Sequence, residues 1–198
     1  MKYINQKDYP DWLYVTRVGL EGDDREIGKT TTVATSACGL CSAIIVADRL
    51  LVNPGFGLKE ALKLSYETKA NWEIGTDYDI YAPAFAEKMG LAWESTDDPE
   101  CLRYCLRTGG VAVALVSGDR EGYIGVFSHS AHYVVVVSEE RDGRIAILDP
   151  AYAQGKYEEK GRTGLVEVKD GVLAVCDMQV LMNDTDTCSP RFWLFWRK

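Results

Sequence analysis

The spacing of apolar residues changes near residue 110, and this change constrains the fold more than any other feature of the sequence. Before it, apolar residues recur with helical spacing and Gly or Pro ends each run. After it, short runs rich in β-branched and aromatic residues predict strands. The predicted helices are 41–52, 58–69, 83–89 and 99–107, and the predicted strands are 111–116, 132–138, 144–148, 165–169 and 192–196. A helical block followed by a strand block indicates an α+β fold rather than the alternating βαβ units of Rossmann or thioredoxin topology.

The sequence shows no boundary between domains. Its 198 residues are 46% hydrophobic and 26% charged, as in an ordinary globular protein. No internal repeat, low-complexity segment or Pro/Ser-rich linker interrupts the chain. We therefore predict a single domain over residues 1–198, built around one sizeable core.

The net charge and the N-terminal residues limit which binding partners and which cellular compartment we expect. The net charge of -8 disfavours binding to nucleic acid or to an anionic membrane surface. No apolar run approaches the roughly 20 residues that span a bilayer, and polar residues break up the first 14 positions, unlike a signal peptide. We expect a soluble, cytoplasmic protein whose six cysteines are reduced thiols. The oligomeric state stays open.

A cysteine precedes the most apolar helix of the chain. Residues 42–51 are apolar nearly all round, which predicts a mostly buried helix. The polar exceptions are Ser42, Asp48 and Arg49. We expect Thr35 and Ser36 to cap this helix and Cys38 or Gly39 to lie in its first turn. The helix dipole favours an anion there, so a thiol at this position ionises more readily than a free thiol, whose pKa is about 8.5.

Only two histidines are available to activate a cysteine, His129 and His132. His132 opens a valine-rich run, 133–137, that is apolar on both faces and is predicted to be a central strand. His129 lies in a polar Ser-His-Ser loop. A strand holds catalytic geometry better than a loop, so we favour His132 as the base.

A carboxylate is expected beside His132. An Asp-Gly turn predicts a hairpin in which Glu139 faces Arg144, and this register brings His132 opposite Ala151. Asp149 then lies on the same face as His132, one diagonal step away at roughly 7 Å between α-carbons. Such a carboxylate would orient the imidazole and stabilise its protonated form.

The segments "SACGLCS", "AHYVVVV" and "AILDP", in this order, resemble the signatures of the papain-like cysteine peptidases, specifically the bacteriocin-leader (double-glycine) peptidase-like branch. The resemblance implies a papain-like fold, with a helical half packed against an antiparallel sheet. It also implies that Cys38 is the nucleophile, His132 the base and Asp149 the residue that orients the base. The segment "YINQKD" is similar to the family's upstream segment, which implies that Gln6 donates to the oxyanion hole with the Cys38 backbone N–H.

The implied activity is hydrolysis of a peptide or amide bond through a thioester by a bacterial cysteine peptidase, with a peptide or protein as substrate and neither cofactor nor metal. The chain departs from the family pattern at Leu40, Ala37 and Thr32, where relatives often have proline, glycine and glutamine. Transporter-fused members also carry membrane and ATPase domains. Cleavage of double-glycine leaders therefore does not follow from the resemblance.

Other functions remain open at this point. Cys38 and Cys41 form a Cys-x-x-Cys motif at a helix start, as in thiol-disulfide oxidoreductases, although the fold order argues against that scaffold. Zinc could be held by combinations of these with other residues, namely Cys101, Cys105, His129 and His132. A third possibility is a weakly active or inactive family member that binds peptides in a groove lined by aromatic residues. The candidates for that groove are Trp12, Tyr14, Trp72, Trp93 and the tail 189–198.

Overall fold

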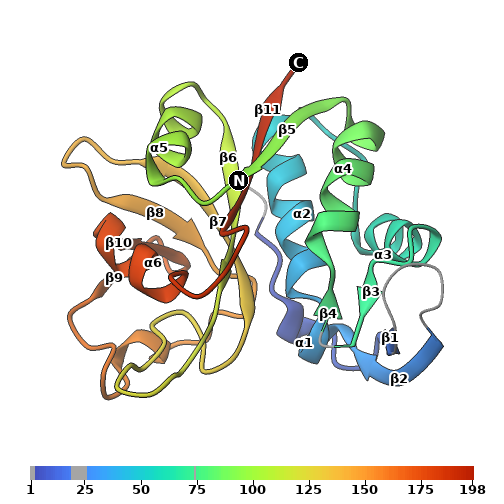
Figure 1. Cartoon of the computed structure of the whole chain (residues 1–198), viewed down its shortest axis with the longest axis horizontal. Coiled ribbons are helices and arrows are strands. Elements are labelled where there is room, and N and C mark those ends of the chain that lie inside the picture. Colours follow the sequence, from blue (N-terminus) through green and yellow to red (C-terminus); the bar gives the residue numbers. More distant parts are fainter. Residues whose placement is uncertain (1–2, 19–25, 74) are drawn as a thin grey trace.

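Two halves of different construction lie side by side in the computed structural model, which describes residues 3–18, 26–73 and 75–198 (Figure 1). The helices are η1 Gln6–Asp8, α1 Val33–Ser36, α2 Cys38–Leu50, α3 Leu58–Glu67, α4 Tyr78–Met89, α5 Pro99–Arg107, η3 Lys156–Glu158 and α6 Met178–Asp184. One half contains α1 to α4, and α5 and α6 belong to the other (Figure 1).

Each half has its own sheet. The smaller, in the helical half, has strand order β2-β1-β3-β4, with β1 Leu13–Val18, β2 Glu26–Thr32, β3 Asn71–Trp72 and β4 Gly75–Thr76. The larger has order β5-β11-β6-β7-β8-β10-β9 and is antiparallel throughout. Its strands are β5 Leu91–Thr96, β6 Val111–Val116, β7 His132–Glu139, β8 Ile145–Leu148, β9 Val166–Lys169, β10 Leu173–Cys176 and β11 Phe192–Arg197. The predicted α+β fold class is confirmed.

The buried side chains on either side of β7 divide the core into two clusters. Val135 and Val137 pack with α2 in one cluster, and Val134 and Val136 pack with α5 and α6 in the other. The strand is the fourth of seven, which confirms the prediction of a central strand that is apolar on both faces. Burying each such valine contributes about 1.5–3 kcal/mol, so the strand that begins at His132 is firmly anchored.

Helix α2 is buried along nearly its whole length, as its composition predicts, but it begins differently from the prediction. Its N-cap residue is Ala37, and no side chain caps it. Thr35 belongs instead to α1, where its Oγ1 accepts a hydrogen bond from the backbone N–H of Thr32. The prediction that Thr35 and Ser36 cap the cysteine helix was therefore wrong, because both residues belong to the separate helical turn α1. Ser42, expected to be a polar exception, is fully buried.

Other element bounds differ more modestly. Helix α4 begins at Tyr78 rather than at Pro83, because Asp77 caps it by accepting a hydrogen bond from Asp79 N at 3.1 Å and because Tyr78 and Tyr81 are fully buried. Helices α2 and α3 end at Leu50 and Glu67, two residues short of their predicted ends. The elements missing from the prediction are η1, α1, β1 to β5, η3, β10 and α6. Within the described ranges, no helix has the length and hydropathy to cross a bilayer.

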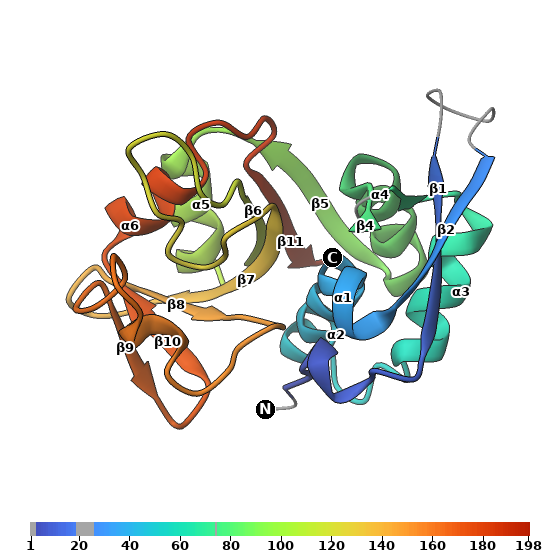
Figure 2. The ribbon, with the colours of Figure 1, turned by 90° about the horizontal axis from the view of Figure 1, so that it is seen from below.

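The N-terminal segment joins the halves. Figure 2 shows it passing between them beside α1 and α2. The backbone N–H of Gln6 donates to Pro150 O in the sheet half at 2.7 Å, and its side-chain Nε2 donates to Ala34 O in the helical half at 2.8 Å. The hydroxyl of Tyr3 adds a bond of 2.6 Å to Asp149 O. This segment therefore fixes how the start of α2 faces the end of β8.

Candidate active site

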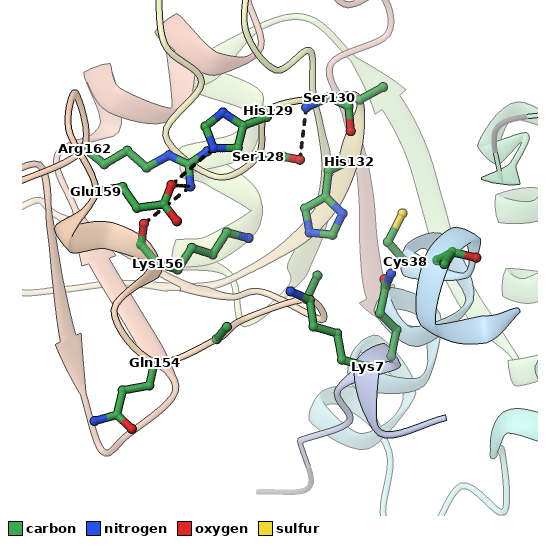
Figure 3. A pocket seen from close by; sticks show the side chains of 15 residues that line it. Lys7, Cys38, Ser128, His129, Ser130, His132, Gln154, Lys156, Glu159 and Arg162 are labelled. Carbon is green, nitrogen blue, oxygen red and sulfur yellow. Dashed lines mark hydrogen bonds and ion pairs between the residues drawn. The ribbon is translucent and has the colours of Figure 1, made fainter. Parts of the chain in front are cut away.

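Cys38 is the first residue of α2 and is partly exposed at the junction between the halves. A residue at this position lies at the positive end of the helix dipole, as the sequence predicts. Figure 3 shows it across the cavity from His132, which projects from β7. Cys41, one turn further along α2, is fully buried, and burial raises its pKa. The two cysteines of the motif therefore have opposite environments.

His132 and Asp149 meet through the β7–β8 hairpin. His132 Nε2 donates to Asp149 Oδ1 at 2.8 Å, and both side chains are buried. The predicted pairing of Glu139 with Arg144 was wrong, because Glu139 pairs with Ile145. An irregularity between Val136 and Ser138 then restores the predicted register for the rest of the hairpin, so that the histidine and the aspartate lie on one face.

Asp149 is fully buried, and its carboxylate accepts four hydrogen bonds. Besides His132, Ala151 N donates to Oδ1 at 2.8 Å, Tyr157 OH donates to Oδ2 at 3.0 Å and Lys156 Nζ donates to Oδ2 at 2.5 Å. Burial alone would raise the pKa of this carboxyl, but the positive charge and hydrogen bond of His132, together with those of Lys156, hold it well below its usual range. The carboxylate is therefore ionised and rigidly held.

The thiol and the imidazole shift each other's protonation. Burial would raise the pKa of the Cys38 thiol, but the charge and hydrogen bond of His132 and backbone hydrogen bonds at Tyr133 and Gly39 lower it. Burial would lower the pKa of His132, but Asp149 and the thiolate raise it to about 9. Both shifts favour a thiolate–imidazolium pair near neutral pH. Because Nε2 faces Asp149, the other ring nitrogen, Nδ1, is the one available to exchange a proton with the Cys38 thiol.

Gln6 lies in η1 and is buried, with 5% of its surface exposed. It lines the same cavity as Cys38 and His132. Its bond to Ala34 O uses one of the two N–H donors of the amide. Its Oε1 is buried without a hydrogen-bond partner among the described residues. Gln6 therefore shares the cavity wall with Cys38, and its role as an oxyanion donor stays a prediction.

The cavity beside Cys38 has a volume of about 550 Å³ and extends from the start of α2 to η3 (Figure 3). A second, smaller cavity of about 210 Å³ also reaches Cys38, on the side lined by Trp72, Leu115 and Tyr133. Cys38 therefore lines both cavities.

Gly39 explains how closely the two halves approach at this point. A Cβ added to it would lie 2.9 Å from Thr76 Cβ and 3.2 Å from a ring carbon of Tyr133. Only glycine lets the first turn of α2 lie against these side chains without displacing one of them. The glycine of the Cys-Gly pair is therefore required by packing.

The other candidates from the sequence do not pair with the thiol, although His129 lines the far wall of the same cavity. His129 is exposed, and its ring nitrogens lie 2.9 Å from Asp119 Oδ2 and 3.2 Å from Glu159 Oε2. Cys105 on α5 is buried in the core of the sheet half. Within residues 3–18, 26–73 and 75–198, no three or more His, Cys, Asp or Glu side chains are grouped so as to hold a metal ion. Burial of Cys41 leaves it poorly placed to exchange with Cys38 as a redox pair.

Sequence reasoning missed Lys156 and Tyr157. They lie seven and eight positions after Asp149, in the short helix η3 at the end of an irregular loop that folds back to bring them to the carboxylate. Of the aromatic residues considered for a groove, Trp72 lines the smaller cavity, whereas Tyr14 is fully buried.

Comparison with known proteins identifies the fold. No protein-family model matches the chain, and a search of curated proteins finds no match either. Among solved structures, the chain is similar to the crystal structure of a "putative C39-like peptidase" from Bacillus anthracis, with a TM-score of 0.52 and 10% sequence identity. The match covers 82% of this chain and 88% of that one. The chain thus has the α+β papain-like fold.

Proposed function

We propose that this protein is a cysteine hydrolase of peptide or amide bonds, with Cys38 as nucleophile, His132 as general base and acid, and Asp149 as the residue that orients His132. The observation that carries the proposal is that Cys38 and His132 line one cavity, while Asp149 lies buried behind the imidazole of His132. These three residues come from the start of α2, the start of β7 and the end of β8, and the Asp149 carboxylate accepts a 2.8 Å hydrogen bond from His132. The resemblance to papain-like peptidases and the shared fold support it.

The proposed reaction is acyl transfer through a thioester. The Cys38 thiolate attacks the carbonyl carbon, and the carbonyl oxygen becomes an oxyanion held by the Cys38 backbone N–H and by Gln6. The imidazolium of His132 gives its proton to the leaving amine, and the C–N bond breaks. A water molecule then gives a proton to His132 and attacks the thioester, the C–S bond breaks, and the acid leaves as the thiolate–imidazolium pair is restored. Asp149 keeps the ring oriented through both steps.

Two features of the described residues support a more detailed assignment. Within the papain-like peptidases, the motifs around Cys38, His132 and Asp149 favour the bacteriocin-leader branch, and we propose that relationship without proposing its leader substrates. All six cysteines are free thiols, which supports a working location in a reducing compartment such as the cytoplasm.

A second candidate is a peptide-binding protein with little or no turnover. The observation that favours it is the engagement of the Gln6 amide, which donates to Ala34 O and so holds one of its donors away from substrate. Losing one oxyanion donor typically costs about 100-fold to 1000-fold in turnover. The two candidates share the same cavity and differ in whether a bond is broken.

Cleavage of a peptide library separates them. The wild-type protein should release defined products, and the Cys38→Ala and His132→Ala variants should release none above background. Reaction with iodoacetamide at pH 7, followed by mass spectrometry, should label Cys38 ahead of the other five thiols. Products that persist in Cys38→Ala, or equal labelling of all exposed thiols, would overturn the catalytic assignment. Binding without cleavage, with Cys38 labelled first, would favour the peptide-binding protein.

A further inference from the structure

The larger cavity beside Cys38 carries a local charge that differs from that of the protein as a whole. Three cationic side chains, Lys7, Lys156 and Arg162, and one carboxylate, Glu159, line it, whereas the whole chain has a net charge of -8. Walls of low dielectric strengthen such a field inside a cavity. An anionic group that is repelled by most of the surface is therefore attracted here.

Arg162 forms part of the cavity wall and is 1% exposed. Its Nε donates to Gly125 O at 2.8 Å, and one terminal nitrogen, Nη1, donates to Glu159 Oε2 at 2.9 Å. The other terminal nitrogen, Nη2, is buried and has no hydrogen-bond partner among the described residues. A buried guanidinium N–H without an acceptor is costly, so the guanidinium retains capacity for one more anionic oxygen.

Glu159 shows that this wall accepts a carboxylate. Its Oε2 lies between Arg162 Nη1 and His129 Nε2, at 2.9 and 3.2 Å, and half of its side chain is exposed. A half-exposed ion pair is held weakly and exchanges readily with other charged groups. A carboxylate from a bound molecule would meet the same guanidinium donor, Arg162 Nη1.

Lys7 supplies the charge on the opposite side. It follows Gln6 in η1, and Figure 3 shows its side chain reaching into the cavity across from Arg162 and Glu159. Lys156 forms an ion pair with Asp149, and Arg162 forms one with Glu159. Lys7, in contrast, forms no ion pair with any described residue. It is therefore the lining cation most available to a ligand.

We propose that this cavity is a carboxylate subsite, and that Lys7 is its specificity-determining residue with Arg162 behind it. The inference rests on the proposed function and deepens it. The preferred substrates are peptides that present a carboxylate to this side of the scissile bond. The carboxylate is either the free C-terminus of a short leaving peptide or the side chain of Asp or Glu.

Matched peptides test the proposal and distinguish the two sources. Pairs that differ only in a C-terminal acid or amide report the first source, and pairs with Glu or Gln next to the scissile bond report the second. The wild-type protein should show a higher kcat/KM for the acid member of at least one pair, by about 3-fold to 10-fold for a partly exposed charge contact. Lys7→Gln should remove that preference and Lys7→Glu should reverse it.

The control is Lys59→Glu, which makes the same change of net charge on exposed α3, away from the cavity. Equal kcat/KM for both members of every pair, or the same effect of Lys7→Glu and Lys59→Glu, would overturn the subsite.

A binding measurement separates this proposal from the catalytic one. Peptides at increasing concentration should protect Cys38 from iodoacetamide, and acid peptides should protect at about 3-fold to 10-fold lower concentration than their amides, unless Lys7 is replaced. Protection that depends on Lys7, in a protein that cleaves no peptide, would sustain the carboxylate subsite and refute the hydrolase. Cleavage without acid preference in either assay would do the reverse.

Discussion

Lys156 lies with Nζ 2.5 Å from Oδ2 of Asp149, the carboxylate whose other oxygen accepts a hydrogen bond from His132. The carboxylate is thus shared between a permanent cation and the imidazole. A cation on one side of a carboxylate reduces the negative potential that it offers on the other side. Lys156 therefore moderates the stabilisation of the imidazolium while it holds Asp149 in place.

Replacing Lys156 with Met should raise the pKa of His132 above its value of about 9. The competing positive charge is lost, and Tyr157 still donates to Asp149 Oδ2 to preserve its position. The chain has only two histidines, so NMR titration of the ring protons in a His129→Gln background assigns the signal without ambiguity. Lys160→Met, on the exposed part of the same loop, is the control. An unchanged or lower pKa in Lys156→Met would contradict this electrostatic role.

The pH dependence of Cys38 alkylation reports the thiolate–imidazolium pair. Because the pKa of Cys38 is lowered, its reaction with iodoacetamide should persist below the pKa of about 8.5 of a free thiol, down to mildly acidic pH. In His132→Ala the burial of the thiol is no longer opposed by a nearby positive charge, so the reaction should shift to alkaline pH. Cys188 and Cys101, which are partly exposed, serve as internal references in the same mass spectra. A common pH profile for all three thiols would exclude the pair.

Much of this site could be predicted from the sequence, because it depends on the order of the motifs along the chain and on which face of a strand each side chain occupies. The β7 pattern placed His132 at the start of a central strand, and the hairpin parity placed Asp149 on its face. The predicted loop was one residue too short, yet an irregularity near Val137 compensates, so the two side chains still meet. A one-residue error without that compensation would have put them on opposite faces.

The rest of the site could not be predicted, because nothing local specifies it. Lys156 and Tyr157 reach Asp149 through an irregular segment, and no spacing rule links them to the carboxylate. The start of α4 at Tyr78 is set by burial of its aromatic side chains, which overrides the usual preference of proline for a helix start. The absence of a cap on α2 follows from α1, a single turn too short to produce a hydrophobic period.

Replacing Asp149 with Asn should destabilise the fold in a pH-dependent way. At neutral pH the variant leaves the ammonium of Lys156, 12% exposed, without its partner, which costs about 3 kcal/mol for a broken buried pair. The folded pKa of Asp149 lies far below its unfolded value of about 3.9. The stability that the Asp149 carboxylate contributes is therefore fully present above the unfolded pKa. It is lost progressively as the pH falls from there through the folded pKa.

The difference in unfolding free energy between wild type and Asp149→Asn should thus be largest near pH 6 and shrink below about pH 4. Urea unfolding at pH 6, 4 and 3 measures it. Glu158→Gln, at an exposed position of the same loop, controls for the removal of a carboxylate. A difference that grows towards acid pH would show that Asp149 is not ionised in the folded protein.

Gly39→Ala should damage both the fold and the thiol. The new Cβ would lie 2.9 Å from Thr76 Cβ, and either α2 or the strand that carries Thr76 must move. Overpacking of this kind typically costs about 1–3 kcal/mol. Thermal unfolding and Cys38 alkylation should both report the change, whereas Gly57→Ala, whose nearest neighbour is the flexible Glu60 side chain, should leave alkylation unaltered. Full reactivity and stability in Gly39→Ala would mean that the packing at this turn tolerates a side chain.

Gln6 provides the sharpest test of catalysis, because the oxyanion that its amide is proposed to stabilise forms during hydrolysis and not during alkylation. Gln6→Ala retains the backbone bond to Pro150 O that holds η1 in place. If the amide stabilises the oxyanion, kcat should fall by about 100-fold to 1000-fold. Alkylation of Cys38 by iodoacetamide forms no oxyanion, so its rate should change little. Gln154→Ala, a glutamine that lines the same cavity, is the matched control. A kcat that falls no further in Gln6→Ala than in Gln154→Ala would leave the Cys38 backbone N–H as the donor and remove Gln6 from the mechanism.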